Sequence, residues 1–421
     1  MPWGIASASE TLRTGLAPLQ HKQLRIMISA RLASALGNSI APIALAFAVL
    51  DLTGSTLYLG EILAARTIPL LLFVLFGGAV ADRIPGNKVL VWAGALSAVT
   101  QSVAAISLLA GHPSVYWLMA LEAVNGASTA FIMPATQGLF PQLVPKNQFR
   151  QANVLYRLTD NGMRLCGAAL AGILVVVVGS GWSIAVDAAT FTIAALLFTR
   201  VKAPGRSNRP RRSVLRDLRD GWTEFTAHRW LTVAVVGGSV MNMAYAGAWN
   251  TLGPAIADHT FGRGWWGVLL GLNAAGVIIG ALAMMRLNPA RPMLFGALSM
   301  IPYVPLLALL ALYPNPLLLA VASFTAGLGL TMFGVVWQTA LQEHVPAAAL
   351  SRVSSYNLLG AYAGLPLGQI AAGYFANRFD SVWVILTASL LCAVAAVAMV
   401  STRSVRTLHR SEPEPEPVPT A

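Results

Sequence analysis

The sequence Gly78-Ala-Val-Ala-Asp82-Arg83-Ile-Pro-Gly86-Asn-Lys88 lies between two long runs of apolar residues. Glycine and proline interrupt regular structure, and the charged side chains need water, so the stretch predicts a tight polar turn. The runs on either side, at about 57–81 and 87–110, are each long enough to cross a bilayer as a helix. We therefore expect a turn that joins two membrane-spanning helices.

Composition places the rest of the chain in a bilayer as well. Of its 421 residues, 56% are hydrophobic and only 10% are charged, and the mean hydropathy is +0.65. A soluble domain is about 25% charged, so this chain has too few charges to cover itself against water. Backbone groups in lipid need partners within their own segment, which makes the apolar runs helices. We predict an all-α integral membrane protein with twelve transmembrane helices, at about 24–50, 57–81, 87–110, 115–138, 151–178, 183–199, 230–256, 265–285, 292–313, 315–340, 353–376 and 380–401.

The basic residues indicate how the chain is oriented. The net charge of +12 would suit a nucleic-acid ligand, but 22 of the 28 Lys and Arg residues fall on one set of alternating connections. The opposite connections carry only Arg263 and Arg378. Cytoplasmic loops carry such an excess, so we expect a multi-pass protein of the cytoplasmic membrane with both termini in the cytoplasm, and no nucleic-acid partner. The first 20 residues are mixed and polar, so no cleaved signal peptide is expected. Four arginines lie inside predicted helices: Arg31, Arg66, Arg157 and Arg164.

The chain also repeats itself at an offset of 201 or 202 residues. The matching features are Gln137 and Pro145 with Gln338 and Pro346, Gly167 and Gly172 with Gly368 and Gly373, and Gly78-Ala-Val-Ala with Gly280-Ala-Leu-Ala. Six predicted helices separate equivalent positions, so both copies have the same orientation in the membrane. We therefore predict two parallel six-helix pseudo-repeats.

These features together resemble the major facilitator superfamily of transporters, over about residues 20–400. In that family the loop between helices 2 and 3 reads Gly, three residues, Asp-Arg, and then Gly and basic residues. This chain matches that pattern at Gly78, Asp82, Arg83, Gly86 and Lys88. The resemblance implies a substrate site between the halves near the middle of the membrane. It also implies rocking of one half against the other, with Asp82 and Arg83 latching the cytoplasmic side close to helix 11.

The same reasoning divides the chain into five regions. We expect a cytoplasmic segment at 1–23, an N-terminal six-helix bundle at 24–199, a basic linker at 200–229, a C-terminal six-helix bundle at 230–401 and a disordered tail at 402–421. Within the linker, the spacing of Val214, Leu215, Leu218, Trp222 and Phe225 predicts an amphipathic helix on the cytoplasmic membrane face.

Helix 5 carries a polar stripe formed by Asn153, Arg157, Asp160 and Arg164, which share one face at helical spacing. Such a stripe does not face lipid. One interpretation is a structural ion-pair network with the loop between helices 2 and 3. The other makes Arg157, Asp160 and Arg164 part of the cytoplasmic gate.

Helix 4 places Glu122, Asn125 and Thr129 on one face. Proton-coupled members of the family often have Arg-x-x-Gln-Gly here, whereas this chain has Glu122-Ala-Val-Asn-Gly. An apolar surround favours the neutral form of a carboxyl group, which suits a proton carrier. Alternatively, Glu122 pairs with a neighbouring arginine such as Arg66. Asp187, a turn or so into helix 6, reads as an interfacial or structural acid.

Helix 1, from Arg31 to Pro42, resembles the drug- and siderophore-exporter branch, in which Asp often follows the glycine, although this chain has Asn38 there. Aromatic rings with a few polar groups suit an amphipathic organic ligand. Ordinary helix packing is the alternative for each residue. The candidates for the substrate cavity are Arg31, Asn38, Arg66, Asn125, Asn242, Tyr245, Trp249, Phe333, Trp337 and Gln338.

Other classes of protein find little support. No lysine follows a glycine, so a phosphate-binding loop is excluded, and the six histidines form no metal-ligand pair. We expect no enzyme activity and no cofactor. The leading hypothesis is a monomeric, proton-coupled exporter of a small amphipathic molecule. A uniporter, an uptake symporter, or a non-transporting receptor or scaffold on the same fold are the alternatives.

Overall fold

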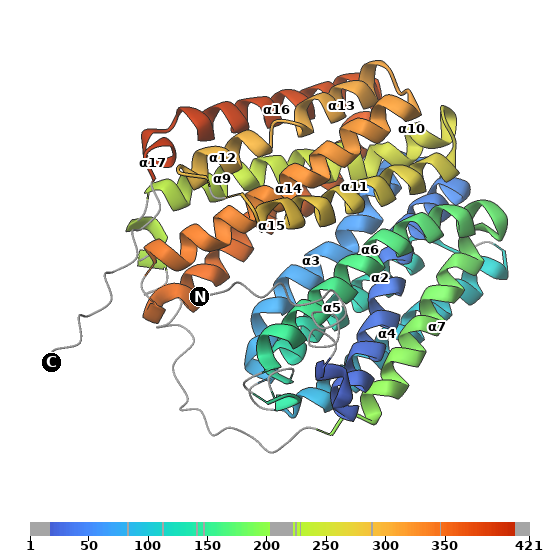
Figure 1. Ribbon diagram of the computed structural model, residues 1–421. Coiled ribbons are helices and arrows are strands. Elements are labelled where there is room, and N and C mark those ends of the chain that lie inside the picture. Colours follow the sequence, from blue (N-terminus) through green and yellow to red (C-terminus); the bar gives the residue numbers. More distant parts are fainter. Residues whose placement is uncertain are drawn as a thin grey trace, which may run out of the picture.

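The computed structural model describes residues 17–81, 84–111, 113–139, 142–145, 148–202, 222–223, 225–227, 229–287, 289–345 and 347–408. Within these ranges the chain is helical, without a strand (Figure 1). A first group of helices comprises η1 (Ala17–Gln20), α2 (Lys22–Thr53), α3 (Thr56–Ala81), α4 (Gly86–Leu109), α5 (Val115–Leu139), α6 (Phe149–Val177) and α7 (Gly179–Thr199). A second group comprises α9 (Arg229–Tyr245), the π-helix η4 (Ala246–Leu252), α10 (Gly253–His259), α11 (Arg263–Met284), α12 (Pro292–Ser299), α13 (Tyr303–Leu312), α14 (Pro316–His344), α15 (Ala347–Ala376), α16 (Ser381–Ser401) and α17 (Arg403–Arg406).

Every apolar run predicted from the sequence is helical in the structure. Among the described residues, nine helical segments are long and apolar enough to cross a membrane. Three more predicted spans are the long helices α5, α6 and α15. The all-α membrane fold is thus confirmed, and the count of twelve crossings stays a prediction.

Several segments differ in detail from the predicted ranges, and three of them differ for a physical reason that the structure shows. α7 begins at Gly179, four residues earlier than expected, because Gly179 adopts a positive φ of 85° and turns the chain sharply after α6. The span predicted at 230–256 is interrupted by the π-helix η4. The span at 292–313 is divided into α12 and α13 just before Tyr303, where Pro302 precedes the second helix.

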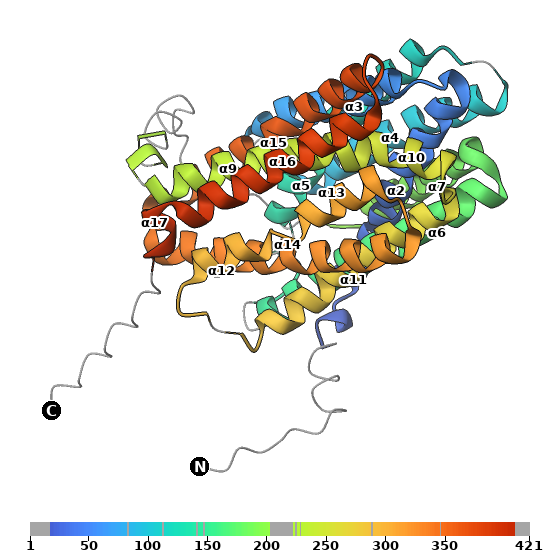
Figure 2. The ribbon, with the colours of Figure 1, turned by 90° about the horizontal axis from the view of Figure 1, so that it is seen from above.

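The two groups contact each other through α6 against α11 and through α3 against α15 (Figures 1 and 2). A Cβ atom on Gly172 of α6 would lie 2.7 Å from the Cα of Gly267 in α11, and Gly60 of α3 meets the backbone of α15 at Gly373. These glycines lie within about two turns of the same ends of their helices. We call this end, which α2 reaches at Thr53 and which lies away from both chain termini, the distal end (Figure 1).

The repeated glycines occupy equivalent positions in the two groups. Gly167 of α6 packs on α2 and its match Gly368 of α15 packs on α9, each within its own group. Gly172 and its match Gly373 instead both pack on a helix of the other group. The structure therefore gives matching residues matching roles, as expected for a duplicated unit.

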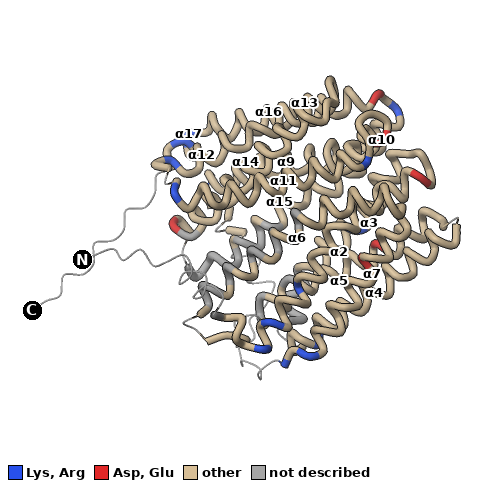
Figure 3. Tube along the Cα trace, turned by 45° about the vertical axis from the view of Figure 1, so that its right-hand side comes forward, with Lys and Arg blue, Asp and Glu red and all other residues tan. Residues whose placement is uncertain are grey.

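Charged residues gather at the two ends of the helices, and few lie along them (Figure 3). Of the predicted amphipathic segment, the structure describes Trp222 and Phe225: Trp222 is exposed and stacks on Phe225, and Phe225 is buried in a cluster with Trp230, Met293 and Val353. The linker therefore ends against the second group of helices, at the end opposite the distal one.

Candidate functional site

An ion pair is buried inside the first group of helices. Arg66 Nη1 of α3 lies 3.6 Å from Glu122 Oε2 of α5, and the two side chains are only 11% and 2% exposed. The helices approach closely here because Gly126, one turn beyond Glu122, faces the backbone oxygen of Arg66. Burying both charges is costly, and removing one partner would leave the other uncompensated. The structure thus adopts the pairing that the sequence offered as the alternative for Glu122.

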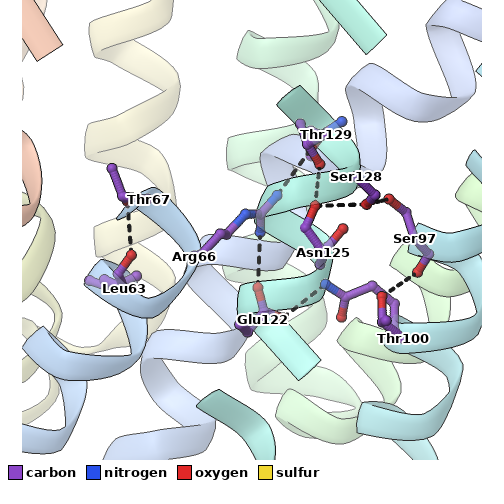
Figure 4. Close-up of polar contacts among 11 residues, drawn as sticks. Leu63, Arg66, Thr67, Ser97, Thr100, Glu122, Asn125, Ser128 and Thr129 are labelled. Carbon is purple, nitrogen blue, oxygen red and sulfur yellow. Dashed lines mark hydrogen bonds and ion pairs between the residues drawn. The ribbon is translucent and has the colours of Figure 1, made fainter. Parts of the chain in front are cut away.

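Two further helices contribute to this site (Figure 4). Arg66 Nη2 donates to Asn38 Oδ1 of α2 at 3.0 Å, and Asn38 in turn donates to the backbone of Ser34 at 2.8 Å. Gln101 Nε2 of α4 donates to Glu122 Oε1 at 2.9 Å. Each charge of the ion pair therefore has one neutral hydrogen-bond partner from another helix.

Polar groups continue along α4 and α5. Asn125 is fully buried, and neither atom of its amide has a hydrogen-bond partner in the described part of the chain. One turn beyond it, the hydroxyl of Ser128 lies 2.8 Å from that of Ser97 in α4. The site therefore extends across four helices near their midpoints (Figure 4). We call the set Asn38, Arg66, Gln101, Glu122 and Asn125 the polar layer.

Asp187 of α7 lies at the level of this layer. Its side chain is fully buried, and its Oδ1 lies against Gly37 of α2, next to Asn38. Electrostatically it is attracted by Arg66 and repelled by Glu122. Of the two roles expected for Asp187, the interfacial one is wrong, because the early start of α7 at Gly179 puts this acid about two turns inside the helix.

The second group of helices has a neutral counterpart to the ion pair. Gly327 of α14, which matches Gly126 at the repeat offset, faces the backbone oxygen of Asn273 in α11. Asn273 Nδ2 donates 3.0 Å to the backbone oxygen of Ser323, which matches Glu122 at the same offset. The same helix contact therefore holds Arg66 and Glu122 in one group, and Asn273 and Ser323 in the other.

Two aromatic cavity candidates, Tyr245 and Trp249, and one amide, Asn242, pack within the second group. Tyr245 stacks on Trp249 and meets Tyr303 edge-on, with ring centroids 5.1 Å apart. Trp249 is fully buried against Trp266, so it belongs to the packed core of this group. Asn242 Nδ2 donates to the backbone of α15 at 2.9 Å. The structure does not bring these residues to the polar layer.

The remaining cavity candidates lie toward the end opposite the distal one. Phe333 stacks on Trp337, and Trp337 packs edge-on against Trp230 of α9, so both rings belong to helix packing. Gln338, next to them, is exposed. Arg31 of α2 lies with its guanidinium 5.8 Å from the centre of the Tyr156 ring of α6.

Most of the predicted cytoplasmic gate lies outside the described residues. This holds for Asp82 and Arg83, and for the side chains of Arg157, Asp160 and Arg164 on α6. Gly78 belongs to the last turns of α3. Gly86 begins α4 close to α5, and Lys88 is exposed in the first turn of α4.

A cluster at the distal end was missed by the sequence analysis. Arg263 of α11 binds both carboxylate oxygens of Asp51 of α2, with Nη1 to Oδ2 at 3.0 Å, and also binds Asp258 of α10 at 2.6 and 2.8 Å. The same guanidinium lies 4.8 Å from the centre of the Phe47 ring. We call Asp51, Arg263 and Asp258 the distal latch, because Arg263 joins the two groups of helices. The signal in the sequence was Arg263 itself, one of only two Lys or Arg residues on that set of connections.

Metal ligands are not clustered: the described residues include no set of three His, Cys, Asp or Glu side chains placed to hold an ion. The arrangement offers instead a buried, charged layer in one group of helices and a neutral, aromatic interior in the other. Such a layer can bind protons or the polar parts of a ligand.

Curated relatives of this chain are efflux proteins. The multidrug efflux pump Tap of Mycolicibacterium fortuitum is 26% identical over 407 residues, covering 91% of this chain and 97% of that protein. Macrolide efflux protein A of Streptococcus pyogenes is 25% identical, covering 86% and 92%. The enterobactin exporter EntS of Shigella boydii is 25% identical, covering 79% and 80%.

Solved transporters share the fold at lower identity. A variant of the nucleoside transporter NupG superposes with a TM-score of 0.73 at 16% identity, covering 90% of this chain and 99% of that one. A bacterial homologue of the lysosomal transporter Spinster gives a TM-score of 0.70 at 13% identity, covering 93% and 98%. Finally, the model of one family, described as transmembrane secretion effector, matches residues 13–417. The chain is therefore a multi-pass membrane transport protein that belongs to the transmembrane secretion effector family of the major facilitator superfamily.

Proposed function

We propose that the protein exports small amphipathic organic molecules across the cytoplasmic membrane in exchange for protons, by alternating access. The observation that carries the proposal is the Arg66–Glu122 pair buried inside the first group of helices, with the buried acid Asp187 at the same level. Charges at that depth are costly and are kept where they serve ions or substrates.

Alternating access is supported by the contacts between the two groups of helices. The close glycine approaches and the Arg263–Asp51 bond all lie at the distal end, and the ribbons of the two groups diverge toward the end that carries the termini (Figure 1). The excess of Lys and Arg on the connections at the end opposite the distal one supports a cytoplasmic location for that end. In this orientation the distal latch closes the outer side, and Asp82 and Arg83 would latch the cytoplasmic side in the other half of the cycle.

Proton coupling is supported by the uneven charge of the two halves. The glycine contact that holds Arg66 and Glu122 in the first half holds Asn273 and Ser323 in the second, so this kind of helix contact forms there without charges. A carboxylate paired with an arginine can release its partner when it takes up a proton. The inward pH gradient would then drive the cycle, since each charge that crosses 100 mV releases about 2.3 kcal/mol.

The proposed substrate class follows from the relatives and from the aromatic residues of the second half. The relatives are described as exporters of multiple drugs, macrolides and enterobactin, which are organic molecules larger than a sugar. We propose that Tyr245, Asn125 and Gln338 face the substrate in other states of the cycle, and that the protein acts as a monomer without enzymatic activity.

Reconstituted liposomes with an internal pH dye test this proposal. Macrolides and catecholate siderophores are added to the wild type and to Glu122→Gln. Proton movement that appears only with particular compounds, and is lost in the variant, supports antiport. Compound flux without proton movement would instead make the protein a uniporter. If no compound is moved, the proposal fails for these substrate classes and the receptor alternative gains weight.

A further inference from the structure

Among the described residues near the polar layer, Asp187 is the acid that does not belong to the ion pair. Both of its carboxylate oxygens lack a hydrogen-bond partner in the described part of the chain, although the side chain is fully buried. Gly37 of α2 leaves the space that Oδ1 occupies, because a Cβ atom there would collide with Asp187 and with the hydroxyl of Thr190. A buried carboxylate without a partner is strongly disfavoured, so the protonated form is the one that this position accommodates.

The register between α4 and α7 brings a hydrogen-bond acceptor level with that acid. Gly94 packs on Ala195, and Gly181 packs on Leu108 and Leu109, so the two antiparallel helices bring Gln101 level with Asp187. Gln101 Nε2 is bound to Glu122, while its Oε1 has no donor among the described residues. A protonated carboxyl group donates one hydrogen bond, whereas an ionised one only accepts. Gln101 Oε1 therefore suits the protonated form of Asp187.

The charges around Asp187 favour one bound proton. Arg66 from α3 and Glu122 from α5 are the charged groups that act on it electrostatically. On the helices packed against α7, Arg31 of α2 is turned toward Tyr156, and Asp51 of α2 and Lys88 of α4 lie near helix ends. Among the described side chains, one cation thus acts on two acids. With both acids ionised this set carries a net negative charge, and with one proton bound it is neutral.

The repeat argues against a purely structural role. At the offsets of 201 and 202, the positions in α16 that match Asp187 are Ala388 and Ser389, and neither ionises. Ser389 Oγ donates to the backbone oxygen of Val304 in α13, the helix that matches α4. The same helix pair therefore packs with neutral residues in the second half, and an acid at this position is not needed for the fold.

We propose that Asp187 binds one exchangeable proton, and that its protonation state affects Glu122 through Gln101 and Arg66. When protonated, Asp187 donates to Gln101 Oε1 and Arg66 pairs with Glu122. When the proton moves to water, the hydrogen bond from Asp187 to Gln101 is lost, the carboxylate competes with Glu122 for Arg66, and no other covalent bond forms or breaks. That this proton drives export rests on the proposed function, but proton binding itself does not.

Infrared difference spectroscopy of the purified full-length protein, titrated between acidic and alkaline pH, tests the assignment without any substrate. We expect a carboxylic-acid C=O band that disappears at alkaline pH in the wild type, is absent in Asp187→Asn, and persists in Glu122→Gln. Asp380→Asn is the matched control, because Asp380 caps α16 and asparagine caps equally well.

Two outcomes overturn the proposal: an unchanged band in Asp187→Asn, or a band that Glu122→Gln alone removes. If Asp187→Asn is not monodisperse, the same spectra are recorded for Asp187→Ser, which introduces the residue type of the matching position Ser389, and the same two outcomes apply. A wild type that shows the Asp187 band but no proton-driven export would reject the proposed function and leave this inference standing.

Discussion

The bond between Asp51 and Arg263 predicts how firmly the distal end stays closed. Asp51→Asn removes an ion pair that joins the two groups of helices, at nearly constant volume. Asp258→Asn removes bonds of the same kind, to the same arginine, that stay within the second group. A comparison of the two variants therefore distinguishes the loss of an ion pair between the two groups of helices from the loss of an Arg263 ion pair within one group.

The size of the effect follows from exposure and geometry. Asp51 and Arg263 are 43% and 24% exposed, so water screens their attraction, and such pairs contribute about 0.2–1 kcal/mol. Both carboxylate oxygens are bound, which places the pair near the upper limit, at about 1 kcal/mol. Arg263→Gln also removes the contact with the buried ring of Phe47, which adds about 0.5–1 kcal/mol. Since 1.4 kcal/mol is tenfold, we expect opening to increase roughly fivefold in Asp51→Asn and roughly 10- to 30-fold in Arg263→Gln.

Distances between spin labels measure this opening. Cysteines at the exposed positions Ser114 and Thr260 report across the distal end, in a background in which the exposed Cys166 is replaced by Ala. Pulsed dipolar spectroscopy then gives the populations of short and long distances in lipid nanodiscs. We expect the long-distance population to increase from wild type and Asp258→Asn to Asp51→Asn and then to Arg263→Gln. Equal populations in Asp51→Asn and Asp258→Asn would refute the latch.

Three further perturbations test other contacts. Gly172→Ala places a Cβ against the backbone of α11 and should favour distal opening in the same assay. The control is Gly162→Ala on the same helix, which meets nothing within 4 Å and should leave the populations of short and long distances unchanged. Equal effects of the two variants would contradict the close approach of α6 and α11. Arg66→Leu leaves the buried Glu122 without its cation and should lower the stability in thermal unfolding by about 3–5 kcal/mol. The double variant Arg66→Leu with Glu122→Leu should lose less stability, and a greater loss in the double variant would argue against the ion pair. Asp82→Asn should abolish or sharply reduce transport while leaving membrane insertion intact, and normal transport would exclude the cytoplasmic latch.

The helices and the repeat could be predicted from the sequence for physical reasons. Lipid forces each apolar run to satisfy its own backbone, so the runs marked the helices to within a few residues. The matched glycines Gly172 and Gly373 were visible in the sequence because close helix contacts tolerate no side chain. The pairing of Glu122 with Arg66 could also be proposed from the sequence, because a buried carboxylate is stabilised by a neighbouring cation.

Contacts between distant segments could not be predicted. Nothing in the sequence links Arg263 to Asp51, which lie 212 residues apart. Nor does the sequence indicate that Gln101 binds Glu122 and not a residue of another helix. The depth of Asp187 depended on a single positive φ at Gly179, which set where α7 begins. The indole of Trp249 was expected in a cavity and is fully buried in the core, because aromatic periodicity alone does not distinguish packing from ligand contact.

Uphill export driven by a pH gradient alone tests the central claim most directly. Liposomes that contain the protein are loaded with a macrolide at equal concentrations inside and outside, the membrane potential is held at zero, and a pH step is imposed. We predict that the macrolide moves against its developing gradient, that a protonophore abolishes this movement, and that Asp187→Asn retains only downhill exchange. Movement that stops at equal concentrations in the wild type, with or without the pH step, would contradict proton-coupled export.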